Sequence, residues 1–257
     1  MLAEAARREP EREALVCGEE RLTYRGYAGA VAAFAAELAA RDVAGRTVAL
    51  VMANSIDHAI AAFAIQAAGA QLAPLNPAYT AHELGDILAD AGPALTLHDK
   101  ALEDLLAPLV PAERRIAIGG ERRFAGQPVD LPVPLPIPGS PALLQYTGGT
   151  SGRSKGVELG HAAIAANVAQ REAALPTTRE DRVLVMTPLF HSYASAMGLH
   201  LAVRAAATLV ILPRFRPELA METVMRERIT LFCGAPTIFN AILAHPDAER
   251  TDWSSLR

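Results

Sequence analysis

A glycine-rich stretch near the middle of the chain has the residue types that phosphate binding requires. Residues 146–158 read YTGGTSGRSKGVE. Glycines let the backbone adopt positive φ and bring its N–H groups close to phosphate oxygens. Thr147, Thr150 and Ser151 add hydroxyl donors, and Lys155 adds positive charge. The stretch therefore predicts a loop that holds a phosphate group.

Three known loop patterns can be compared with this stretch. The Walker pattern, GxxxxGK followed by Ser or Thr, aligns from Gly149, but Ser154 replaces its second glycine and Gly156 its magnesium-binding hydroxyl. The dinucleotide pattern GxGxxG does not match. The nucleophile elbow GxSxG fails because Arg153 stands where glycine is required. A surface loop without a ligand is the remaining alternative, and the coincidence of a preceding strand, hydroxyls and a lysine argues against it.

One histidine is placed where it could contact a substrate. His191 follows a predicted strand and an apolar Leu-Phe pair, and it is either a packed histidine at a helix start or a site residue. Tyr193 and Met197 follow on the same predicted helix, as pocket residues or as ordinary core. The other histidines show no metal-ligand spacing: they are His58, His82, His98, His161, His200 and His245.

Composition excludes several other classes of function. The 257 residues carry a net charge of −4, so no basic field favours nucleic acid or an anionic membrane. The longest uncharged run follows His58 and is broken by Gly69, Gln71, Pro74, Asn76 and Pro77, so we expect no membrane span. Cys17 and Cys233 lie far apart and outside any CxxC motif, which argues against a disulfide framework or a zinc site. Two reduced cysteines fit a cytoplasmic protein.

Apolar runs alternate with helical patterns along the chain. The runs predict strands over residues 47–52, 71–75, 94–98, 115–119, 142–147, 157–159, 182–188, 208–213 and 229–234. Helices are expected over residues 23–41, 55–69, 80–92, 102–109, 161–174 and 236–245. The alternation predicts an α/β fold of layered, mostly parallel sheets with crossover helices. The proline-rich residues 124–140 are a connector, an extended surface segment or a domain boundary.

Several ordered motifs resemble one family. Residues 147–161, TGGTSGRSKGVELGH, resemble the phosphate loop of the adenylate-forming enzymes, S/T-S-G-T-T-G-x-P-K-G followed by a strand and T-H. Ser154 departs from the usual proline, and Gly160 from the usual threonine. AAGAQLAPLNPAYTAHEL (67–84), TPLFHSYASAMG (187–198), CGAPTIFNAILAHP (233–246) and WSSLR (253–257) resemble further family segments in the family's order. The chain is identified as a member of this superfamily, close to the acyl-CoA synthetases and ligases.

The resemblance implies a two-step reaction and a set of site residues. A carboxylic acid attacks the α-phosphate of Mg-ATP to give an acyl-adenylate, and coenzyme A then displaces AMP. The acid stays open, because TGGT is common in the fatty-acid branch while His-Ser-Tyr at 191–193 resembles aryl-acid ligases. The residues implied to hold ATP phosphates are Thr147, Gly148, Gly149, Thr150, Ser151, Gly152 and Lys155, and those implied to line the acyl site are His191, Tyr193, Met197 and Gly234.

The resemblance also implies parts that these residues do not contain. The family completes its site with an adenine-binding strand, a magnesium-holding glutamate, a ribose-binding aspartate and a small C-terminal domain with a catalytic lysine. Their motifs do not occur in residues 1–257, so we expect a partial N-terminal AMP-binding domain, with no catalytic residue or metal ligand of its own and inactive alone. The alternatives are a truncated, non-catalytic module that binds phosphate and acyl groups and, against Ser154 and Gly156, a P-loop-like NTPase.

Overall fold

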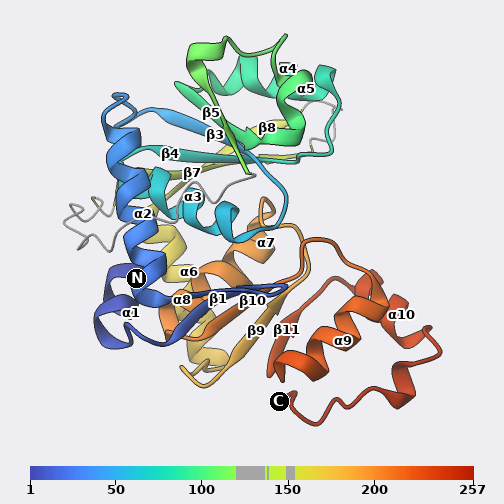
Figure 1. Cartoon of the computed structure of the whole chain (residues 1–257). Coiled ribbons are helices and arrows are strands. Elements are labelled where there is room, and N and C mark those ends of the chain that lie inside the picture. The colour runs from blue at the N-terminus through green and yellow to red at the C-terminus, as the bar shows by residue number, and fades with distance from the viewer. Residues whose placement is uncertain (120–136, 138, 149–153) are drawn as a thin grey trace. The chain divides into compact units, whose positions relative to one another are not determined.

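The computed structural model describes residues 1–119, 137, 139–148 and 154–257 (Figure 1). They form two compact units, each considered by itself. The first comprises Met1–Tyr27, Asn54–Ile56 and Asn167–Arg257, and the second comprises Ala28–Ala53 and Asp57–Ala166. The proline-rich residues 124–140 lie largely outside the described residues, so their role as connector, surface segment or boundary stays a prediction.

A six-stranded sheet, in the order β6-β5-β3-β4-β7-β8, organises the second unit. Its strands are β3 (Thr47–Val51), β4 (Gln71–Leu75), β5 (Leu95–Asp99), β6 (Arg115–Ile118), β7 (Pro141–Thr147) and β8 (Lys155–Gly160). Neighbours from β6 to β7 pair in parallel, and β8 pairs antiparallel with β7 at the edge. The strands have short apolar centres and crossover connections, so this sheet confirms the predicted α/β class.

Helices cover both faces of this sheet. Figure 1 shows α4 and α5 on one face and α3 on the other. On the α4 side, Leu84, Ile87 and Leu88 pack with Val51 and Leu75 in one buried cluster. The helical elements that contribute to this unit are α2 (Tyr24–Ala39), α3 (Ile56–Ala67), α4 (Ala81–Ala91), η1 (Lys100–Leu102), α5 (Glu103–Leu106), η2 (Ala112–Arg114) and α6 (His161–Ala174).

The ends of α4 follow from the sequence. The Thr80 hydroxyl accepts a hydrogen bond from Glu83 N, and the Glu83 carboxylate accepts one from Thr80 N, which confirms the predicted capping box. The helix ends at Gly92, in the left-handed region at φ 51°. The helix predicted over residues 102–109 is wrong in length, because α5 is a single turn. Pro108 follows it closely and has no N–H to continue the helix.

A five-stranded sheet, in the order β11-β9-β10-β1-β2, organises the first unit. Its strands are β1 (Glu13–Cys17), β2 (Glu20–Thr23), β9 (Arg182–Val185), β10 (Thr208–Ile211) and β11 (Leu231–Cys233). All pairs are parallel except β1 with β2, which form a hairpin. The sequence pattern does not single out this hairpin, because the apolar centre of β1 is only Ala-Leu-Val between charged or polar flanks.

Helices α9 and α10 pack on one face of this sheet. Met221 and Val224 of α9 and Ile238 and Ile242 of α10 share a buried cluster with Leu184 of β9. Pro236 occupies the first turn of α10, as predicted. The helical elements of this unit are α1 (Leu2–Arg8), α7 (Ser192–Ala194), the π-helical η3 (Ser195–His200), α8 (Leu201–Ala205), α9 (Pro217–Glu227), α10 (Pro236–Leu243) and η4 (Ala248–Arg250).

A buried carboxylate joins three segments of the first unit. Asp181 is 3% exposed and accepts hydrogen bonds from Arg257 Nη2 at 2.7 Å, Thr178 N at 2.7 Å and Thr230 Oγ1 at 2.7 Å. Burial by itself would raise the pKa of Asp181, but these donors and the Arg257 charge outweigh it and lower the pKa to about 2. The folded state therefore favours the ionised carboxylate.

Replacing Asp181 with Asn should reveal this contribution as a pH dependence. The folded pKa lies below the ordinary value, so the stabilisation is complete above about pH 4 and is lost as the pH falls towards 2. We expect Asp181→Asn to lower the free energy of unfolding by about 2 kcal/mol at pH 7, and by less at pH 3. Urea denaturation at both pH values measures it. Asp104→Asn, at an exposed position, is the control; an equal loss in both variants would contradict the assignment.

Candidate functional site

The predicted phosphate loop connects the two strands of a β-hairpin. β7 ends at Thr147 and β8 begins at Lys155, and these two residues are Cα partners in the antiparallel register. Thr147, Gly148 and Lys155 are all exposed. The structure therefore brings the lysine and the first threonine together at the root of the loop. Gly149, Thr150, Ser151 and Gly152 lie outside the described residues, so their predicted roles stay predictions.

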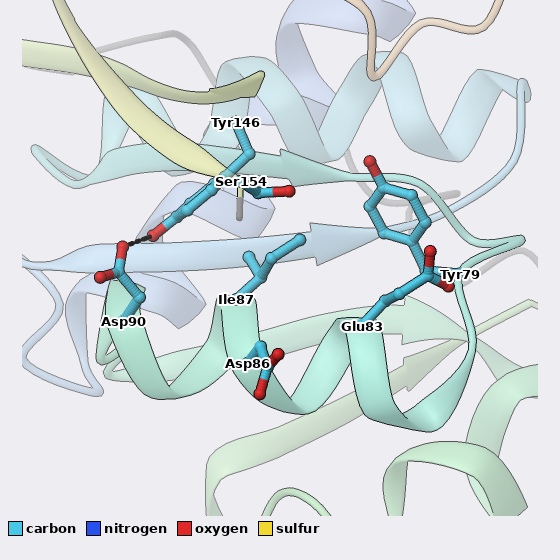
Figure 2. A pocket seen from close by; sticks show the side chains of 7 residues that line it. All are labelled: Tyr79, Glu83, Asp86, Ile87, Asp90, Tyr146 and Ser154. Carbon is cyan, nitrogen blue, oxygen red and sulfur yellow. Dashed lines mark hydrogen bonds between the residues drawn. The ribbon is translucent and has the colours of Figure 1, made fainter. Parts of the chain in front are cut away.

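Tyr146 lies just before the family motif and connects the root of this loop to α4. Its hydroxyl donates to Asp90 Oδ2 of α4 at 2.7 Å (Figure 2). Burial, and then the neighbouring Asp90 carboxylate, raise the pKa of Tyr146, so the phenol stays protonated and able to donate. Its place directly before Thr147 is the only signal that the sequence offers for this role.

A pocket lies beside the loop root, between α4 and the hairpin. Figure 2 shows its lining side chains, which include Glu83, Asp86 and Asp90 of α4. Ser154 brings the end of the loop to the same pocket. Three carboxylates repel a phosphate group. The carboxylates of this pocket therefore disfavour an anion there.

His191 begins the helical segment that follows β9. Its Nδ1 accepts a hydrogen bond from Tyr193 N at 3.2 Å, so the ring caps α7. In the neutral ring the hydrogen then sits on Nε2, which can donate to a carboxylate. The side chain is exposed rather than packed in the core. This geometry leaves His191 accessible to a ligand.

Tyr193, Met197 and the end of β11 lie together. The Cys233 thiol donates to Met197 O at 3.7 Å. Burial, and then the neighbouring Cys233, raise the pKa of Tyr193. Burial raises the pKa of the Cys233 thiol, so it is neutral at physiological pH rather than a nucleophile. Gly234 follows directly, and a Cβ there would meet Phe239 at 3.4 Å. The structure thus brings three of the predicted acyl-site residues to one place and adds Cys233, which the sequence reasoning did not select.

Met197 itself lies in the π-helical segment η3. Nothing in the sequence pattern predicts this π-helical turn. A π-helical turn inserts an extra residue into the helical ladder, and such turns are frequent at functional sites. Within η3, a Cβ at Gly198 would approach Val185 Cγ2 to 2.9 Å, so the glycine lets the helix lie directly on β9. This close approach fixes the position of Met197, the preceding residue.

The two predicted sets of site residues belong to different units. Thr147, Gly148 and Lys155 are in the second, and His191 and the group around Met197 are in the first. Among the described residues, no group of three or more His, Cys, Asp or Glu side chains could hold a metal ion. In the same part of the chain, no helix combines the length and the apolar character needed to cross a membrane.

Gly156 provides a test of the packing at the loop root. A Cβ there would meet Leu144 Cδ1 at 3.0 Å and Tyr146 Cζ at 3.3 Å, whereas a Cβ at Gly148 would meet nothing within 4 Å. Both alanine variants lose flexibility in the unfolded chain, which favours folding equally. We therefore expect Gly156→Ala to be less stable than Gly148→Ala by about 1 kcal/mol in urea denaturation. Equal stability would show that the tyrosine ring does not pack on Gly156.

A second pair of glycines tests the close approach of η3 to β9. Gly198→Ala should destabilise by about 1–3 kcal/mol, because the methyl group collides with Val185. Gly85→Ala on α4 is the matched control, since its Cβ would make an ordinary contact with Leu109 at 3.6 Å. That change should stabilise by up to about 1 kcal/mol through helix propensity. Thermal unfolding distinguishes them, and a stabilised Gly198→Ala would contradict the packing.

Comparison with known proteins places the chain in a family. The family model of the AMP-binding enzymes matches residues 2–257. The feruloyl-CoA synthase of Amycolatopsis sp is 34% identical over 98% of this chain and 51% of its own length. The long-chain-fatty-acid–CoA ligase of Bacillus subtilis is 27% identical over 100% of this chain and 53% of its own length.

A solved structure agrees with the fold. ATP-bound MatB from Rhodopseudomonas palustris superposes with a TM-score of 0.87 at 25% identity, over 100% of this chain and 54% of that one. The chain thus spans about half the length of the curated relatives it matches. The matched residues include both the β7–β8 hairpin and the segment that carries His191. Residues 2–257 belong to the AMP-binding enzyme family.

Proposed function

We propose that this chain contributes the phosphate-binding loop and one wall of the acyl site to an acid–thiol ligase. The ligase activates a carboxylic acid with ATP and transfers it to coenzyme A. The observation that carries the proposal is the β7–β8 hairpin, which presents Thr147 and Lys155 side by side and exposed. The same residues match the AMP-binding family, whose relatives include named CoA ligases.

In the first half-reaction, a carboxylate oxygen attacks the α-phosphorus of ATP. The bond from that phosphorus to the bridging oxygen breaks, and pyrophosphate leaves. The loop residues Thr147–Lys155 bind the β- and γ-phosphates, where Lys155 stabilises the charge that develops on the leaving group. Thr150 and Ser151 add hydroxyl donors. Mg²⁺ enters with ATP, and we assign it no ligand in this chain.

In the second half-reaction, the thiol sulfur of coenzyme A loses its proton to solvent and forms a bond to the acyl carbon. The bond from that carbon to the phosphate oxygen breaks, and AMP leaves. We place His191 near the carboxylate, where its Nε2–H can donate, and Tyr193, Met197 and Gly234 along the acyl group. The group around Cys233 supports this wall. The relatives are named for feruloyl and for long-chain fatty acyl groups. We therefore propose a carboxylic acid as the substrate and do not choose between aryl and fatty acids.

The strand after the loop supports this proposal over a P-loop-like NTPase. In a Walker loop the lysine opens a helix, whose N-terminus contributes to phosphate binding. Lys155 instead opens β8. A non-catalytic module that binds phosphate and acyl groups remains the second candidate, and binding without turnover is the result that would favour it. A cytoplasmic location and a partial N-terminal domain both stay predictions.

Carboxylate-dependent exchange of pyrophosphate into ATP tests the proposal. A protein of the relatives' full length that contains these residues should catalyse exchange with at least one acid from a panel of ferulate, indoleacetate and long-chain fatty acids. Residues 1–257 expressed alone should not, because the relatives use about twice this length. Exchange by the 257 residues alone would contradict the proposed division of the site, and ATP hydrolysis without any acid would favour an NTPase.

Lysine variants test the loop assignment directly. Lys155→Ala should weaken ATP use in the exchange assay by about tenfold or more, through loss of charge at the leaving group. Lys100→Ala is the matched control, since Lys100 is also exposed in the second unit but lies in η1. A Thr150/Ser151 double alanine variant should resemble Lys155→Ala. Unchanged ATP kinetics in both loop variants would show that the loop assignment is wrong.

A further inference from the structure

A buried amide in the first unit holds three backbone groups at once. Asn54 is 7% exposed. Its Nδ2 donates to Thr187 O at 3.0 Å and to Leu212 O at 3.2 Å, and its Oδ1 accepts from Leu189 N at 2.7 Å. Both the nitrogen and the oxygen of the amide are therefore hydrogen-bonded. No other side chain of this size can donate two hydrogen bonds and accept one in this arrangement.

These backbone groups belong to segments that leave the sheet at one edge. Thr187 lies two residues beyond the end of β9, and Leu212 directly follows β10. Parallel pairing sets Val185 beside Ile211, so the two segments start at the same level. Leu212 N still donates to Val185 O at 2.9 Å. The Asn54 amide then joins the carbonyl groups of Thr187 and Leu212.

The third contact leads directly to the proposed acyl site. Leu189 is 2% exposed and lies two residues before His191. Between them the chain makes a tight turn, in which His191 N donates to Pro188 O at 3.0 Å. His191 then caps α7, and its carbonyl accepts from Ser195 N at 3.1 Å. A shift of Leu189 is therefore carried into the position of the His191 ring and the start of the helix.

We propose that Asn54 is a positioning residue for the carboxylic-acid substrate. It fixes residues 187–189 against the edge of the sheet and thereby sets where His191 meets the carboxylate. The expected effect on the KM for the acid rests on the proposed function. The restraint of residues 187–189 by Asn54 rests only on the three hydrogen bonds. Nothing in the sequence pattern singles out Asn54, because it is an ordinary polar residue between a predicted strand and a predicted helix.

Two variants separate the contacts that Asn54 makes. Asn54→Asp keeps an acceptor for Leu189 N but loses both donors, and at neutral pH its charge faces two carbonyl oxygens. Asn54→Ala loses all three contacts. The matched control is Gln66→Glu, because Gln66 is 9% exposed, lies on α3 in the second unit and donates to Ala142 O at 3.4 Å. It repeats the change from amide to carboxyl group at a buried position in the other unit.

Steady-state exchange kinetics of the full-length protein test the positioning role. We expect Asn54→Asp to raise the KM for the acid by about tenfold and the KM for ATP by much less, because the displaced segment carries His191. An equal rise in both KM values, or the same pattern in Gln66→Glu, would overturn the positioning role.

Hydrogen–deuterium exchange gives a readout that does not depend on activity. Peptides covering residues 186–191 should exchange faster in Asn54→Ala than in the unchanged protein and in Gln66→Glu, since the Leu189 N–H loses its acceptor. Unchanged exchange there would overturn the inference even if the enzyme is active. If no acid supports pyrophosphate exchange, the proposed function fails, while faster deuterium exchange in this segment would still uphold the structural role of Asn54.

Discussion

Parallel pairing of β9 with β10 and β11 is the constraint on which the proposed acyl site depends. The register sets Val185 beside Ile211 on one side and beside Cys233 on the other. The chain segments after these residues must therefore leave the sheet at one edge, as carboxyl ends of parallel strands do. His191 and Gly234 lie in these segments, and Asn54 is hydrogen-bonded to Thr187, Leu189 and Leu212 at the same edge.

The loop root in the second unit depends on a different kind of pairing. An antiparallel edge strand, β8, returns along β7, so the residue that enters the loop and the residue that leaves it are neighbours. If β7 and β8 were parallel, a crossover segment would run between them, and Thr147 and Lys155 would lie at opposite ends of the sheet. The hairpin also places the ring of Tyr146 between Gly156 and Asp90 of α4, a helix whose start is fixed by its own capping box.

Much of the fold was predictable because its signals are local. Capping residues, a proline at N1 and short apolar runs fix α4, α10 and the central strands within a few residues of their ends. The β1–β2 hairpin was not predictable from its own pattern, since a three-residue apolar centre is stabilised mainly by pairing with distant β10. The π-helical η3 was missed for a similar reason: the contact of Gly198 with Val185 is tertiary.

The sequence by itself determined the family motifs, the alternation of strands and helices, and the residue types of the phosphate loop, because each is carried by neighbours along the chain. Tertiary structure alone decided that the loop closes a hairpin, that Tyr193, Met197 and Cys233 meet, and that Asn54 holds Thr187, Leu189 and Leu212. These contacts join residues far apart in the chain. Their geometry follows from strand register and burial, which no local pattern encodes.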